Sequence, residues 1–91
     1  MIRHSVLVSN SLGLHARAAA KLVRLASCFS SEVYLSREDA DQKINSKSIL
    51  GILMLAASQG TRLTFSIEGS DEAEAGEAIR QLFEDKFGEE G

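Results

Sequence analysis

The chain has 91 residues, of which 44% are hydrophobic and 25% charged, so it can build one small core but is too short to divide into two. We therefore expect a single domain over residues 1–91. Its net charge of −3 and aromatic content of 5% argue against nucleic-acid binding, which needs a surplus of Lys and Arg and, for RNA, stacking aromatic side chains.

The N-terminal sequence and the cysteine content limit which cellular compartment and which kinds of site we expect. Met1-Ile2-Arg3-His4-Ser5 lacks the basic and then apolar stretches of a signal peptide, and no apolar run is long enough to cross a bilayer. We therefore expect a cytoplasmic protein with no membrane insertion. A single cysteine, Cys28, excludes an internal disulfide and a CxxC site, and we expect no metal and no cofactor.

The N-terminal third predicts a strand, a turn and a helix. Residues 2–8 alternate with the period of a strand that has one buried face, and His4 falls on that face as a partly buried polar residue. The turn residues at 10–13 end the strand. From Ala16 to about Ser27, apolar residues recur at helical spacing, which predicts an amphipathic helix beginning beside His15; its inward residues are Ala19, Leu22, Val23 and Ala26.

The middle of the chain predicts two short strands and a short helix. Residues 32–37 alternate as a strand, 38–41 form its polar turn and 42–45 form a short third strand. The apolar segment 49–57 follows a serine-rich stretch and ends near Gly60, a residue type that terminates helices. We expect a helix there, with one face in the core and some apolar side chains left exposed.

The C-terminal third predicts one more strand and a final helix. Residues 61–68 alternate as a strand, with Leu63, Phe65 and Ile67 on one face. Ser70 is the expected N-cap of the last helix, whose buried stripe consists of Ala75, Ala78, Ile79, Leu82 and Phe83. The resulting order, βαββαβα, folds most simply as an α+β domain, a four-stranded antiparallel sheet with all helices on one face.

Candidate chemistry lies in Gly13-Leu14-His15-Ala16-Arg17. His15 stands where a helix begins, and the backbone N–H groups of Ala16 and Arg17 have no partner inside that helix. An anion on the imidazole would meet those donors, the positive end of the helix dipole and the Arg17 guanidinium. These features suit a histidine that carries a transferable anion, and they also suit an ordinary surface histidine.

The same five-residue run resembles the active-site motif of HPr, the histidine-containing phosphocarrier family of the phosphoenolpyruvate:sugar phosphotransferase system. A second HPr-like stretch is Asn45-Ser46-Lys47-Ser48-Ile49-Leu50-Gly51-Ile52-Leu53, and the resemblance covers residues 1–87. It implies an open-faced β-sandwich of four strands and three helices, in agreement with the order of elements. It also implies that His15 accepts a phosphoryl group from enzyme I and donates it to enzyme IIA proteins, while Arg17 contacts the phosphate.

Further roles follow from the resemblance. Ser48 matches the serine that an HPr kinase/phosphorylase modifies in some members, and simple helix capping is an equally weighted interpretation. The surface that docks on enzyme I matches Ala16, Ala20, Arg24, Leu50 and Leu53, although core packing is the alternative for the leucines. No second acid, base or metal cluster accompanies His15, so we expect a carrier that is not itself an enzyme. We also expect the protein to be a monomer.

One residue departs from the common pattern of the family. Ala18 stands where many HPr proteins have proline, and the chain contains no proline. Alanine keeps helical propensity, so phosphorylation is not put in doubt, but alanine here is also found in HPr-like proteins of regulatory phosphotransferase chains. Sugar uptake and a regulatory relay both stay open, as does a small-ligand-binding domain with a ferredoxin-like order of elements.

Overall fold

The computed structural model describes residues 1–89, and its elements follow the expected order. The strands are β1 (Ile2–Leu7), β2 (Glu32–Arg37), β3 (Ile44–Asn45) and β4 (Arg62–Glu68). The helices are α1 (Ala16–Ser27), α2 (Ile49–Met54) and α3 (Glu72–Glu84), followed by a 3₁₀ turn, η1 (Lys86–Gly88). Within the described part of the chain, no helix has the length and apolar character needed to span a membrane.

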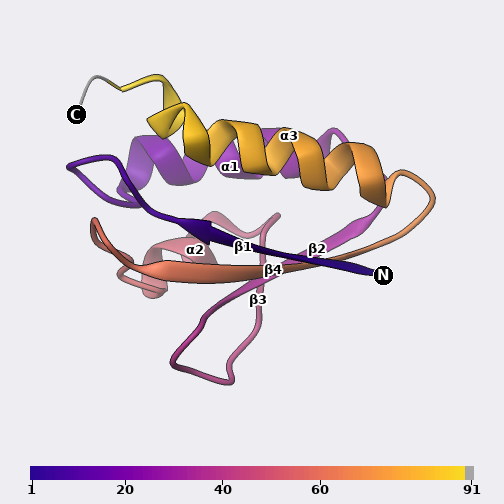
Figure 1. Cartoon of the computed structure of the whole chain (residues 1–91), viewed down its shortest axis with the longest axis horizontal. Helices are drawn as coiled ribbons and strands as arrows, with labels where there is room; N and C mark the ends of the chain where they lie inside the picture. The colour runs from indigo at the N-terminus through magenta and orange to yellow at the C-terminus, as the bar shows by residue number, and fades with distance from the viewer. Residues whose placement is uncertain (90–91) are drawn as a thin grey trace.

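All four strands join one antiparallel sheet in the order β1-β4-β2-β3, so β4 is central. Phe65 of β4 stands opposite His4 of β1 and Leu35 of β2. Helices α1 and α3 lie side by side over one face of the sheet (Figure 1), while α2 packs against α1 and sends Ile52 into the same core. The expected α+β open-faced sandwich of four strands and three helices is confirmed.

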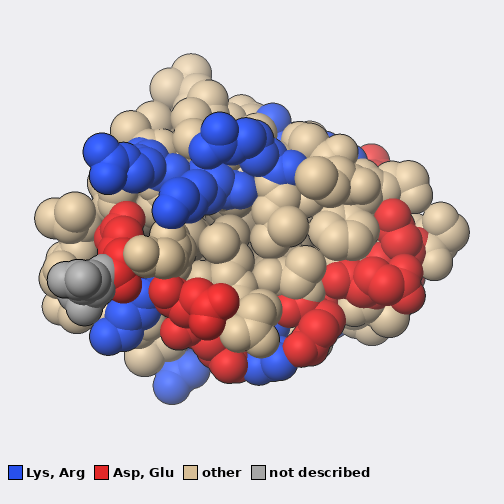
Figure 2. Space-filling model, turned by 90° about the horizontal axis from the view of Figure 1, so that it is seen from above, with Lys and Arg blue, Asp and Glu red and all other residues tan. Residues whose placement is uncertain are grey.

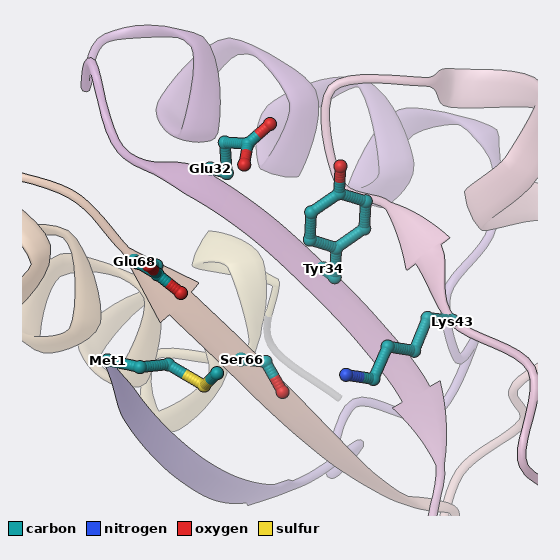
Figure 3. A pocket seen from close by; sticks show the side chains of 6 residues that line it. All are labelled: Met1, Glu32, Tyr34, Lys43, Ser66 and Glu68. Atoms are coloured by element: carbon teal, nitrogen blue, oxygen red, sulfur yellow. The ribbon is translucent and has the colours of Figure 1, made fainter.

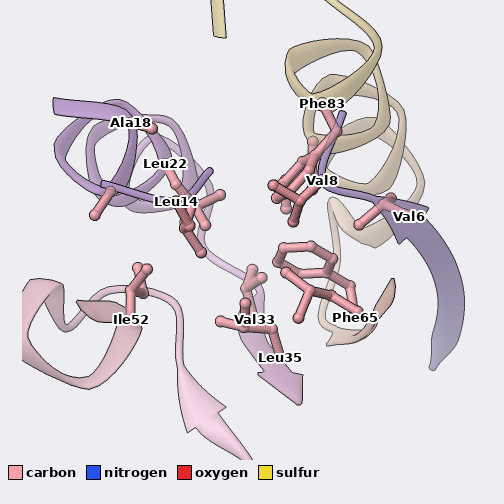
Figure 4. Close-up of a cluster of buried hydrophobic side chains, with 14 of the residues drawn as sticks. Val6, Val8, Leu14, Ala18, Leu22, Val33, Leu35, Ile52, Phe65 and Phe83 are labelled. Atoms are coloured by element: carbon pink, nitrogen blue, oxygen red, sulfur yellow. The ribbon is translucent and has the colours of Figure 1, made fainter. Parts of the chain in front are cut away.

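The core forms between the sheet and the helices because each element turns its apolar side inward. In β4, Leu63, Phe65 and Ile67 are fully buried and the residues between them are not, as the alternation predicts. Figure 4 shows side chains of the strands meeting those of the helices in one cluster. The buried residues of α1 are Ala18, Ala19, Leu22 and Ala26, and Val23 is only half-buried.

Helix α3 lies close to β1 at Gly76. A Cβ atom built on Gly76 would lie 2.6 Å from Nε2 of His4, so a side chain there would require the His4 ring or the helix to shift. Ala75, Ile79 and Phe83 are buried as expected. Ala78 and Leu82 are only half-buried, so this edge of the predicted stripe lies at the boundary of the core.

The middle elements are shorter than the sequence predicts. Strand β3 covers Ile44–Asn45 rather than 42–45, because only these two residues pair with β2. Helix α2 ends at Met54 rather than Ala57, since Ala56 takes a left-handed φ of 50° and the Ala57 carbonyl accepts a hydrogen bond from Leu14 N–H at 2.8 Å. Gly60 does not end this helix; it lies in the turn that precedes β4.

The N-cap of α3 is Asp71, not Ser70. The Asp71 side chain does not cap its own helix but accepts hydrogen bonds from the backbone N–H groups of Ser30 and Ser31, at 2.9 and 3.0 Å. The Ser31 hydroxyl also donates to Asp71. These hydrogen bonds, led by the Ser31 hydroxyl and the Ser30 N–H, lower the pKa of Asp71 from 3.8 to about 2. The carboxylate therefore joins the start of α3 to the chain before β2.

Replacing Asp71 with alanine should reduce stability in a pH-dependent way. The folded-state pKa of Asp71 is below its unfolded value, so its contribution is present above pH 3.8 and is lost as the pH falls towards about 2. Urea denaturation of the wild type and Asp71→Ala should show a stability difference that shrinks over this interval. Asp41→Ala, which removes an exposed carboxylate from the loop between β2 and β3, is the control; a difference for Asp71→Ala that does not change with pH would contradict the prediction.

Candidate functional site

His15 is the N-cap of α1. Its backbone is extended, with φ −77° and ψ 179°, and its carbonyl accepts the first helical bond from Ala19 N–H at 2.8 Å. Its Nδ1 atom accepts a hydrogen bond from Arg17 N–H at 3.2 Å, so the lone pair of Nδ1 faces the free N–H groups of the first helical turn. The side chain is 27% exposed. The ring thus stands at the start of the helix, as expected, but is half-buried rather than fully turned to solvent.

The loop before His15 is held by close backbone packing. Gly13 has a left-handed φ of 68°, and a Cβ atom there would lie 2.7 Å from the Ala57 carbonyl oxygen and 2.9 Å from Cα of Ser58. The Asn10 side-chain amide donates to the Gly13 carbonyl at 2.7 Å. Together with the bond from Leu14 N–H to Ala57, these contacts set the direction in which the chain enters α1.

Replacing Gly13 with alanine should damage both the fold and the site. An L side chain at this φ, in contact with backbone atoms that cannot move aside, should cost at least about 2 kcal/mol of unfolding free energy, measured by urea denaturation. The matched control is Gly60→Ala: Gly60 also has a positive φ, 93°, but open space around its Cβ position, so about 1 kcal/mol should be lost. Equal losses in the two variants would contradict the role of the close approach.

Glu89 is part of the site, although no signal in the sequence indicated this. One of its carboxylate oxygens lies 2.5 Å from Nε2 of His15, and the other accepts from the Asn10 amide at 2.9 Å. The Asn10 hydrogen bond, and then that of His15, lower the pKa of Glu89, so the group is a carboxylate at neutral pH. Because Nδ1 accepts from Arg17 N–H, the neutral ring must carry its proton on Nε2, where Glu89 accepts it.

Charge is distributed unevenly over the helical side of the molecule. Seen from above the helices, one group of basic side chains gathers along one edge, and the acidic side chains lie on the other half together with several more basic ones (Figure 2). Helix α1 carries Arg17, Lys21 and Arg24, while α3 carries Glu72, Glu74, Glu77 and Glu84. Arg17 and Arg24 are exposed, so His15 lies at the end of a basic strip.

The remaining predicted residues lie on α1 and on the neighbouring helix α2. Ala16 is exposed and Ala20 is half-buried on α1, and Leu50 and Leu53 are 67% and 37% exposed on α2. Met54 is 74% exposed, so the two leucines belong to a larger apolar patch, and Ile52 is the α2 residue that enters the core. Ser48 is the exposed N-cap of α2, and its hydroxyl oxygen accepts from Gly51 N–H at 3.3 Å.

Among the hollows on the surface, two bear on the location of the site. One, of about 230 Å³, is next to the ring and is lined by Leu12, Leu14, His15, Ala56, Ala57 and Ser58. The other, of about 220 Å³, is on the open face of the sheet (Figure 3) and is lined by Met1, Glu32, Tyr34, Lys43, Ser66 and Glu68, none of them a predicted site residue. Residues 1–89 contain no group of three His, Cys, Asp or Glu side chains placed to hold a metal ion.

Comparison with known proteins places this chain in the class of small phosphocarrier domains. The family model described as the PTS HPr component phosphorylation site matches residues 2–85. The phosphocarrier protein HPr of Xylella fastidiosa (strain 9a5c) is 48% identical over 90 residues, 99% of each chain. The crystal structure of HPr from Thermoanaerobacter tengcongensis is 45% identical, covers 100% of both chains and superposes with a TM-score of 0.93. The chain belongs to the HPr family of the phosphotransferase system.

A related structure bears on the oligomeric state. A crystal structure described as an HPr dimer from Thermoanaerobacter tengcongensis is 45% identical, covers 98% of this chain and 100% of its own, and has a TM-score of 0.76. A protein of this family can therefore dimerise. For the present chain, the monomer stays a prediction from the sequence.

Proposed function

We propose that this protein is a cytoplasmic phosphoryl carrier that accepts a phosphoryl group from enzyme I on His15 and passes it to enzyme IIA proteins. The observation that carries the proposal is the hydrogen bond from Arg17 N–H to Nδ1 of His15. It aims the lone pair of one ring nitrogen at a helix N-terminus, where an attached anion is stabilised. The protein is a reactant in each transfer and needs no active site for a small substrate.

The transfer proceeds by nucleophilic attack of Nδ1. Its lone pair forms a bond to phosphorus, the bond between phosphorus and the donor group on enzyme I breaks, and the proton on Nε2 stays in place. The phosphoryl oxygens then accept from the N–H groups of Ala16 and Arg17, the second of which now donates to Nδ1. The Arg17 guanidinium adds a charge-assisted contact. In the second transfer, the acceptor group on a IIA protein forms a bond to phosphorus and the bond between Nδ1 and phosphorus breaks, which restores the neutral ring.

Docking is assigned to the surface next to the ring. Ala16, Ala20 and Arg24 on α1 and Leu50 and Leu53 on α2 lie on helices that contact each other. An apolar patch beside a basic strip suits a partner whose surface is apolar with an acidic rim. The complete site lies within a single chain, which supports a monomer as the form that transfers phosphate, and size-exclusion chromatography tests this.

Phosphorylation with enzyme I and phosphoenolpyruvate, followed by transfer to purified IIA proteins, tests the function. Acid-labile phosphate should form on His15 and move to at least one IIA protein. The IIA proteins that accept phosphate will show whether the protein serves sugar uptake or the alternative, a regulatory relay without sugar transport. Ala18, which is also found in HPr-like proteins of regulatory chains, is consistent with the relay. Absence of phosphate after incubation with the cognate enzyme I would contradict the proposal, and tight binding of a metabolite to that unphosphorylated chain would favour a ligand-binding domain.

Leu50→Ser should weaken docking without unfolding the protein. Leu50 is exposed, so its removal costs little core packing, but an apolar residue at the centre of an interface contributes more than 1 kcal/mol, which corresponds to roughly a fivefold to tenfold higher KM for the carrier in the enzyme I assay. Leu7→Ser, at an exposed leucine of β1, is the matched control and should leave KM unchanged. A change in kcat alone for Leu50→Ser would argue against docking at this patch.

Regulation through Ser48 is a second part of the proposal. The exposed hydroxyl at the start of α2 stands beside Leu50 in the sequence, so a phosphate there would add negative charge within the proposed docking surface. An HPr kinase/phosphorylase, with ATP, should produce acid-stable phosphate that is absent from Ser48→Ala. That modified protein should be a poorer acceptor from enzyme I, and an unchanged rate would contradict the regulatory role.

A further inference from the structure

The C-terminal segment after α3 is built to hold one residue against the active-site ring. Phe87 is buried, and its ring packs edge-on against Phe83 at a centroid distance of 4.8 Å. Lys86 and Phe87 both take left-handed φ values, 55° and 58°, and Gly88 follows at 77°. A left-handed conformation costs free energy at any residue other than glycine. Burial of the Phe87 ring must therefore hold this turn in place.

Contacts with α1 and with the loop before it fasten the same segment. The Lys21 ammonium donates to the Phe87 carbonyl at 2.5 Å, and the Asn10 amide donates to the Glu89 carboxylate at 2.9 Å. Asn10 is fully buried and bonds the Gly13 carbonyl through the same amide nitrogen. One buried side chain therefore joins the loop that carries His15 to the residue that contacts its ring.

We propose that Glu89 is a positioning residue for phosphoryl transfer: its carboxylate holds the proton of His15 on Nε2 and fixes the ring with Nδ1 towards the start of α1. The inference rests on the proposed phosphocarrier function. Its support is geometric, because the two ring nitrogens are engaged from opposite sides, Nε2 by Glu89 at 2.5 Å and Nδ1 by Arg17 N–H at 3.2 Å. An acidic partner on one imidazole nitrogen orients the other nitrogen for reaction.

The same contact acts on the phosphorylated state. When Nδ1 forms its bond to phosphorus and the proton stays on Nε2, the ring becomes positively charged. A carboxylate that accepts the Nε2–H bond stabilises this cation more than it stabilises the neutral ring. Glu89 should therefore assist both the approach to His15 and the lifetime of the phosphorylated ring.

The test combines a rate with a spectroscopic signature of the hydrogen bond. In the wild type, the Nε2–H proton of His15 should give a downfield proton resonance that exchanges slowly with water. Glu89→Ala should lose this resonance and accept phosphate from enzyme I about tenfold more slowly, as expected on removal of an orienting partner. Glu74→Ala, which removes one exposed carboxylate at the opposite end of α3, should change neither.

The outcomes separate this inference from the proposed function. If the wild type takes no phosphate on His15, the phosphocarrier function is wrong. If the wild type is phosphorylated and Glu89→Ala matches it in rate, the positioning role is wrong. A Glu89→Ala variant that is slower but keeps the wild-type Nε2–H resonance would show a merely structural effect, and this would also overturn the inference.

Discussion

His15→Ala will take no acid-labile phosphate from enzyme I, and it will fold. The substitution removes the only atom that the proposal assigns as nucleophile, so the loss should be complete rather than partial. It also removes the side chain that caps α1, and loss of an N-cap typically costs about 1 kcal/mol, which a stable domain tolerates. Phosphorylation with labelled phosphoenolpyruvate and urea denaturation measure the two effects separately.

His4→Ala is the matched control for this experiment. His4 is half-buried on β1, opposite Phe65 in the sheet and against Gly76 of α3. It lies outside the proposed site, so its replacement should leave phosphorylation intact. Phosphate on the His15→Ala variant, or its loss from a folded His4→Ala variant, would show that the site has been assigned to the wrong histidine.

Phe65→Ala should cause the largest loss of stability of any variant considered. Phe65 is fully buried in the central strand, and its ring packs edge-on against Phe83 at a centroid distance of 5.5 Å. Removing a fully buried phenylalanine side chain typically costs about 3–5 kcal/mol, through lost transfer free energy and the cavity that remains. Because small domains are stable by only about 5–15 kcal/mol, urea denaturation should show a much lower midpoint or a largely unfolded chain.

Phe29→Ala is the control for the size of the lost side chain. Phe29 follows α1 and packs only partly against the core, so its truncation exposes less apolar surface and leaves no closed cavity. We expect less than half the loss seen for Phe65→Ala. Equal losses would mean that the sheet centre is not the main source of stability, contrary to the burial pattern.

The strong periodic patterns of the sequence predicted the architecture. Alternation at Leu63, Phe65 and Ile67 placed β4 with one buried face, and the spacing of Ala19, Leu22 and Ala26 identified the inward side of α1. These predictions succeeded because side-chain direction repeats every two residues in a strand and about every 3.6 in a helix, whatever the rest of the fold does. His15 was placed at a helix start because the helical spacing begins at the next residue, Ala16.

Boundaries that depend on distant partners were predicted less well. Helix α2 stops at Met54 because the Ala57 carbonyl pairs with Leu14, and β3 is short because only Ile44 and Asn45 are in register with β2. The start of α3 is displaced from Ser70 to Asp71, whose carboxylate binds Ser30 and Ser31 instead of its own helix. Leu14, Ser30 and Ser31 are all about 40 residues from their partners, and helical and strand propensities carry no information about such contacts.

From the amino-acid sequence alone follow the class of fold, the helix that begins at His15 and the likeness to HPr, because these depend on local periodicity and on a contiguous motif. Tertiary structure alone decides what surrounds the ring. Glu89 lies 74 residues from His15 and reaches it only because Phe87 is buried against Phe83 and Asn10 holds the carboxylate. A contact between residues this far apart arises from packing of the whole core, which no local pattern encodes.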